Sequence, residues 1–130
     1  MTRNSGVALR ALGGAAALMS VVAGSASADP LPTQVGACAV ATVKQVETRL
    51  ENMPGSGSAI SYDNGGYQVS YDTVAAIDAS RLGDSVKLCL ISIPKNCPPG
   101  DSRGRIYGAT NLRTHGQWTE PDSEHACGGA

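Results

Sequence analysis

The four cysteines constrain the fold of this chain more than any other feature. They lie far apart in the sequence, and no two of them form the C-x-x-C spacing shared by zinc ribbons and thioredoxin-type redox centres. An even number of cysteines in a small chain with an export signal is typical of a disulfide framework. We therefore predict two structural disulfides among Cys38, Cys89, Cys97 and Cys127.

Three pairings of these cysteines are possible. We favour Cys89–Cys97, because a turn at residues 94–96 can close that short span, which leaves Cys38–Cys127 to join the two ends of the domain. The main alternative pairs Cys38 with Cys89 and Cys97 with Cys127. A long-range bridge would remove about 4–5 kcal/mol of entropy from the unfolded chain, which is comparable with the whole stability of a small domain.

Residues 1–28 have the pattern of a cleavable signal peptide. Arg3 and Arg10 give a positive start, residues 11–24 are apolar or small, and residues 25–28 present a small-x-small cleavage motif. The apolar run falls short of the roughly 20 residues that span a bilayer. No cysteine follows the cleavage site, which argues against a lipid anchor. We expect a secreted or periplasmic protein whose residues 29–130 form a single small domain.

The charge of residues 29–130 argues against a nucleic-acid partner. Eight basic residues face eleven acidic ones in this part, so its net charge is near −3. Nucleic-acid-binding domains usually carry a basic face, and no basic cluster here is interleaved with stacking aromatic residues. We expect no cofactor, and the partner to be an extracytoplasmic protein. The sequence leaves the oligomeric state open.

Residues 38–50 can be interpreted in two ways. Val40, Val43, Val46 and Leu50 lie at helical spacing, whereas the many valines and threonines favour a strand. We predict a long, bulged strand, with a helix and an α+β fold as the alternative.

Four further elements follow along the chain. Residues 58–71 predict a hairpin with Asn64-Gly65 in its turn, and residues 72–81 predict a short helix capped by Asp72 or Thr73. Residues 85–93 are apolar on both faces and predict a central strand that is covered on two sides. Residues 106–119 predict a second hairpin with its turn at 113–116.

These elements predict a mainly β fold. About five short strands and one brief helix fit a small antiparallel sheet or barrel of the OB or SH3 type, held by the disulfides.

The densest polar region is the C-terminal third of the chain. The proline-rich loop at residues 97–100 would hold the following charged residues in a defined geometry, and such preorganisation lowers the cost of binding. Alternatively, Asp101 pairs with Arg103 or Arg105 simply to close the loop. The candidate binding residues are Asp101, Arg103, Arg105, Arg113, His115 and Trp118.

Metal binding and catalysis have weaker support in the sequence. His115, Asp122, Glu124 and His125 could in principle converge on a metal, but the last two are neighbours that point apart in an extended chain. No G-x-S-x-G motif presents a nucleophile. We therefore expect no metal site and no catalytic residue. The enzymatic alternative is a small secreted hydrolase that uses carboxylates with His115 or His125.

One segment resembles a known family. Ser56-Gly57-Ser58, followed by Tyr62, Gly65-Gly66 and Tyr67, is similar to the serine-glycine loop and tyrosine of bacterial periplasmic inhibitors of C-type lysozyme. The resemblance covers about a dozen residues, and the second motif of that family, a tryptophan followed by lysine-glycine, is missing. It implies inhibition of a secreted hydrolase. The function that we predict is non-catalytic binding, or association with the cell envelope, outside the cytoplasm.

Overall fold

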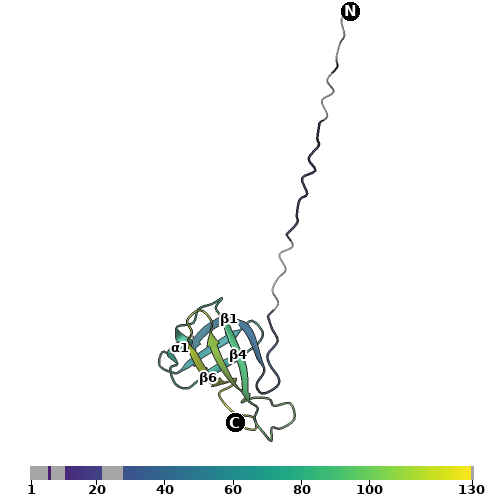
Figure 1. Cartoon of the computed structure of the whole chain (residues 1–130). Helices are drawn as coiled ribbons and strands as arrows, with labels where there is room; N and C mark the ends of the chain where they lie inside the picture. The colour runs from purple at the N-terminus through teal and green to yellow at the C-terminus, as the bar shows by residue number, and fades with distance from the viewer. Residues whose placement is uncertain (1–5, 7–10, 22–27, 130) are drawn as a thin grey trace, which may run out of the picture.

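The computed structural model describes residues 6, 11–21 and 28–129, which form one curled antiparallel sheet and one short helix (Figure 1). The elements are β1 (Cys38–Thr48), β2 (Ser58–Tyr62), β3 (Tyr67–Ser70), α1 (Ala75–Asp78), β4 (Ser85–Ser92), β5 (Ile106–Asn111) and β6 (Gln117–Pro121). The sheet has six strands in the order β3-β2-β1-β4-β5-β6 and curls into a half-barrel. The mainly β prediction is confirmed, with six strands where about five were expected.

Much of the predicted signal peptide lies outside the described residues. These include most of the positive start and most of the cleavage motif. Residues 11–21 contain no helix or strand, and Leu12 is 98% exposed. In the part of the chain that the structure describes, no helix is both long and apolar enough to cross a membrane.

The strand predicted at residues 38–50 is confirmed as β1, and the helical alternative is wrong. Its first half, from Cys38 to Thr42, pairs with β4, whereas its second half, from Gln45 to Thr48, pairs with β2. A bulge between Val43 and Gln45 separates the halves, and bulges bend and twist the strand that carries them. β1 is therefore shared by the two halves of the curled sheet.

Both predicted hairpins are confirmed, but the capping of the helix is not. The β2–β3 turn places Gly65 at φ 83°, a conformation that glycine adopts without strain. The helix is a single turn, and neither Asp72 nor Thr73 caps it. The N-cap position is occupied by Val74, whose side chain cannot cap, and its N–H donates to Ser58 Oγ of β2 over 2.9 Å.

The core lies on the concave face of the sheet. It is built from alternate residues of the central strands together with one residue of α1, and its largest members include Ile60, Tyr62, Ile77, Leu88 and Leu90. The prediction that β4 is covered on both faces is wrong, because Ile91 on its other face is 47% exposed. A sheet that curls around one core leaves its convex face in solvent, and the single-turn helix covers only a small part of the fold.

A single buried side chain bridges the two edges of the half-barrel. Gln68 on β3 is 1% exposed, and its Nε2 donates to the carbonyl oxygens of Tyr107 (2.8 Å) and Glu120 (3.1 Å). Its Oε1 accepts from the Tyr62 hydroxyl (2.7 Å) and from Trp118 Nε1 (2.9 Å). These four bonds use both donors and both lone pairs of the amide. Gln68 therefore joins β3 to β5 and β6, which do not pair with it.

The disulfides are Cys38–Cys89 and Cys97–Cys127, and no described cysteine is free. The prediction of two disulfides is confirmed, whereas the favoured pairing of Cys89 with Cys97 is wrong and the alternative is correct. β1 and β4 are neighbours in the sheet, and their register places Cys38 directly opposite Cys89. Two disulfides are compatible with an extracellular protein.

Candidate functional site

The first two candidate binding residues, Asp101 and Arg103, form an ion pair with each other. The Asp101 carboxylate accepts from Arg103 Nε (3.0 Å) and Nη2 (2.9 Å), and also from the Gly128 N–H (3.0 Å). Arg103 Nη2 also donates to the carbonyl oxygen of Gly129 (3.1 Å). The Arg103 guanidinium holds the pKa of Asp101 well below its usual range. The pair joins the loop to the C-terminal tail, so the loop-closing interpretation accounts for its bonds.

Further bonds hold the same loop against the tail. The Cys127 N–H donates to the carbonyl oxygen of Arg103 (2.8 Å), and the Gly104 N–H donates to Asp122 Oδ1 (2.8 Å). Together with the Cys97–Cys127 disulfide, these contacts unite residues 94–105 and 122–129 into what we call the C-terminal lobe. Within this lobe, Asp101, Arg103 and Asp122 direct their side chains to one another or to the backbone.

Arg113 is held in a second polar cluster, below the β5–β6 turn. Its Nε and Nη2 donate to the two carboxylate oxygens of Asp84 over 2.7 and 2.9 Å. Asn111, which is fully buried, donates from Nδ2 to Asp84 Oδ2 and to Ser80 Oγ, each over 2.9 Å. The Arg113 guanidinium first, and the Asn111 amide second, hold the pKa of Asp84 well below its usual range. Arg113 thus anchors the turn rather than presenting a free cation.

This cluster makes stability depend on pH in a defined direction. Because folding lowers the pKa of Asp84 below its ordinary value of 3.8, its contribution is present above that pH and is lost as the pH falls toward the folded-state value. We expect the melting temperature of the protein to exceed that of Asp84→Asn most at pH 6, and the difference to shrink at pH 4 and again at pH 3. Calorimetry at these pH values measures it. Asp72→Asn, at an exposed position, is the control; a difference that stays constant with pH would contradict the assignment.

The other candidate residues do not gather at one site. Trp118 is buried in the core, whereas His115 is exposed in the β5–β6 turn with φ 62°. Arg105 lies before β5, at the opposite end of that hairpin. His125 follows the far end of β6, so the two histidines flank opposite ends of one strand. Among residues 6, 11–21 and 28–129, no group of three or more His, Cys, Asp or Glu side chains could hold a metal ion.

The serine-glycine segment that resembles lysozyme inhibitors packs within the fold and holds its elements together. Ser58 is fully buried, and its hydroxyl donates to Asp78 Oδ1 over 2.7 Å. A side chain on Gly57 would collide with the carbonyl oxygen of Ser70, so the backbones of β2 and β3 meet closely there. These residues link β2 to β3 and α1, and they do not form a projecting loop.

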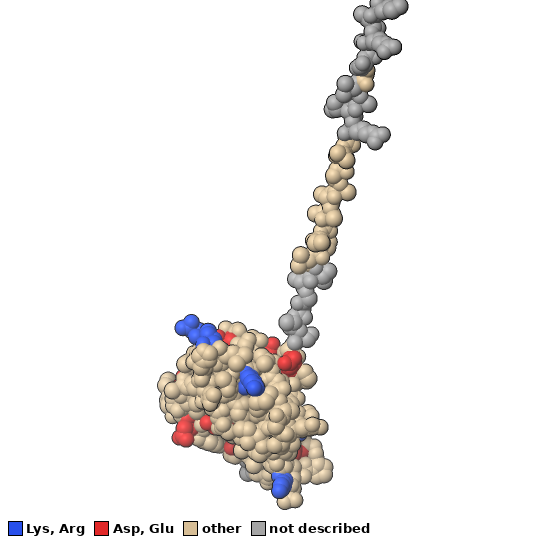
Figure 2. Space-filling view, in the orientation of Figure 1, with Lys and Arg blue, Asp and Glu red and all other residues tan. Residues whose placement is uncertain are grey.

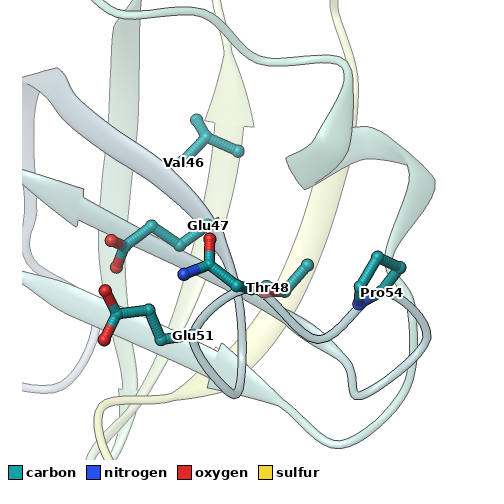
Figure 3. Close-up of a pocket in the computed structure, with 6 residues that line it drawn as sticks. Val46, Glu47, Thr48, Glu51 and Pro54 are labelled. Atoms are coloured by element: carbon teal, nitrogen blue, oxygen red, sulfur yellow. The ribbon is translucent and has the colours of Figure 1, made fainter.

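The site that the structure offers instead is an open cavity of about 510 Å³ beside the second half of β1 (Figure 3). It is lined by Val46, Glu47, Thr48, Glu51, Asn52 and Pro54. None of these was a candidate in the sequence. The sequence does show Glu47 and Glu51 four residues apart, on either side of the end of β1. It does not show that β4 ends before it reaches them, which is what leaves the cavity open.

One side of this cavity is an unpaired strand edge. The ladder between β4 and β1 ends at Thr42, and Val43 still bonds to Gly83 and Asp84, just before β4. No strand among the described residues continues beside residues 45–48. The Arg49 N–H donates to the carbonyl oxygen of Gly57, just before β2 (3.0 Å). In an antiparallel pair every second residue bonds to the neighbouring strand, so Glu47 and Gln45 also direct their backbone groups toward β2. The backbone groups of Val46 and Thr48 therefore point away from β2. We call residues 45–48 the open edge of β1.

Two carboxylates give the cavity its charge. Figure 3 shows the carboxyl groups of Glu47 and Glu51 pointing the same way on one side of the cavity, with Pro54 on the other. Glu47 accepts a hydrogen bond from the Gln45 amide, and neither glutamate belongs to an ion pair between described residues. Arg49, the nearest arginine in the sequence, is paired with Glu124 (3.0 Å). Neither carboxylate beside the open edge is therefore paired with a cation of the described residues.

The cavity and the surface offer polar groups for binding rather than a reactive pair. Cysteine and histidine are absent from the lining residues, and the Thr48 hydroxyl donates to the carbonyl oxygen of Leu50 (2.6 Å). On the face of the described residues that Figure 2 shows, Lys and Arg side chains stand apart and form no continuous basic patch.

Comparisons of the chain with protein-family models, with curated proteins and with solved structures found no match.

Proposed function

We propose that this chain is an exported, non-catalytic binding domain that acts outside the cytoplasm and meets its partner at the open edge of β1. The observation that carries the proposal is the cavity of about 510 Å³, which lies between an unpaired strand edge and two carboxylates that form no ion pair with any described residue. Unpaired strand edges are surfaces that other chains readily join, and natural proteins usually cover them. The single hydroxyl in the lining is used in an internal bond, which supports binding over hydrolysis.

Export is supported by the way the domain begins. Asp29, the first residue after the predicted cleavage site, accepts from the Val40 N–H through Oδ2 (3.3 Å). Its carbonyl oxygen accepts from Asn64 Nδ2 (3.0 Å), and Pro32 is buried. Asp29, the first residue after the predicted leader, is thus already bonded to the domain. Pairing of all four cysteines supports an oxidising destination, either the periplasm or the medium.

Site-directed photocrosslinking tests the proposal in cells that export the protein. A photoreactive phenylalanine analogue replaces Asn52, which lines the cavity, or Leu112, which is exposed in the β5–β6 turn. We expect a discrete adduct from position 52 and none from position 112, because only the first lies at the open edge. The yield of this adduct should fall when Glu47→Gln and Glu51→Gln are added. The intact mass of the exported protein should correspond to a chain that begins at Asp29.

Identical adducts from both positions would contradict the proposal, since they would show contact without a preferred surface. Absence of any adduct from position 52, in cells where the intact mass confirms export, would contradict it equally.

A further inference from the structure

We infer that the open edge of β1 binds an extended peptide segment with Lys or Arg at alternate positions, by strand addition. This inference rests on the proposed function and names the chemistry of the partner. Val46 and Thr48 each direct one N–H and one C=O away from β2, so the edge offers two donors and two acceptors. An extended peptide can satisfy all four groups with its own backbone, which is the basis of strand-addition complexes.

The length of the edge sets the length of the segment. At about 3.3 Å per residue, the four residues 45–48 match a peptide segment of about four residues. The segment would lie beside residues 45–48, beyond the bonds that Val43 makes to Gly83 and Asp84. Antiparallel addition would continue the pattern of the sheet, in which every neighbouring pair of strands is antiparallel.

The charge of the cavity selects the side chains of the partner. Alternate residues of an added strand point to the same face, so cationic residues at every second position can approach Glu47 and Glu51 together. The remaining residues would face Val46 and Pro54, the apolar part of the lining, which favours small apolar side chains. The net charge near −3 of residues 29–130 also attracts basic segments and repels acidic ones during encounter.

The experiment uses residues 29–130 with both disulfides formed, because this part contains all six strands of the described residues and both bridges. The probe is a fluorescein-labelled octapeptide that alternates lysine and valine. Two control peptides replace each lysine with glutamate, or carry N-methyl groups on the backbone amides that face the edge. We expect saturable binding of the lysine-valine peptide at low salt, measured by fluorescence anisotropy, and none of either control peptide up to 1 mM.

Protein variants then assign the site. Glu47→Gln with Glu51→Gln should weaken binding about 5-fold, which is the combined effect of two solvent-exposed charge pairs. Asp72→Asn, an exposed acid outside the cavity, should leave the affinity unchanged. Both glutamates are exposed, so the variant should keep its melting temperature. The amide NMR signals of Val46 and Thr48 should shift when the peptide is added.

Several results would overturn the inference. These are no binding of the lysine-valine peptide at 1 mM, equal binding of the glutamate or N-methylated peptide, or an affinity that the double glutamine variant does not change. If crosslinking at position 52 still yields a discrete adduct, the proposed function stands and only the peptide chemistry is wrong. If crosslinking fails as well, the proposed function fails with it.

Discussion

Replacing Gln68 with alanine should lower the free energy of unfolding by about 4 kcal/mol, because it leaves buried polar groups without partners. The Tyr62 hydroxyl and the Trp118 indole would each lose the acceptor that they share. The carbonyl oxygens of Tyr107 and Glu120 would lose a donor at the same time. The substitution would weaken the contact between β3 and β6, which no backbone hydrogen-bond ladder joins.

Equilibrium unfolding in guanidinium chloride, with both disulfides intact, measures this loss. Gln117→Ala is the matched control, since Gln117 is an exposed glutamine at the start of β6 and should change stability by less than about 0.5 kcal/mol. A loss of less than about 1 kcal/mol for Gln68→Ala would mean that water or neighbouring side chains replace its bonds.

Removing the Cys38–Cys89 disulfide should have an effect of similar size. The bridge links residues 51 positions apart, and in the loop-entropy model a closure of that length is worth about 4 kcal/mol. We expect this loss for the Cys38→Ala, Cys89→Ala double variant in urea unfolding. Cys38 is exposed and Cys89 half-buried, so truncation should leave little cavity to add to the cost.

The second disulfide provides the comparison for the first. Cys97 and Cys127 are 30 positions apart, which in the same model is worth only a few tenths of a kcal/mol less. The Cys97→Ala, Cys127→Ala variant should therefore lose nearly as much stability. If one bridge proves much less important than the other, residual structure in the unfolded chain, rather than loop length, sets their contributions.

Local signals predicted the strands of this fold well. Asn64-Gly65 marked the β2–β3 turn, and the valines and threonines of residues 38–50 marked β1 although their spacing also suited a helix. Both signals act through neighbouring residues, so the sequence displays them directly. The predicted cap of α1 is wrong because the helix begins only at Ala75, which places Val74 rather than Asp72 or Thr73 at the N-cap position.

Features that depend on strand order could not be predicted in the same way. Cys38 faces Cys89 only because β4 adds to β1 on the side opposite β2, and chain order alone does not show this. Glutamine is a residue type that is usually exposed, and no local pattern indicates that the amide of Gln68 is buried and donates to two distant carbonyl groups. The cavity likewise exists because β4 stops at a particular register. Of the candidate residues in the C-terminal third, Asp101 and Arg103 pair with each other, and Arg113 pairs with Asp84.

The glutamates beside the open edge of β1 have a consequence for solubility. Residues 45–48 form an exposed strand edge that is able to pair with a second copy of the chain. Two copies aligned edge to edge would bring their Glu47 and Glu51 side chains near one another, and like charges in contact oppose association. The carboxylates that would attract a basic segment therefore also keep the protein from aggregating with itself.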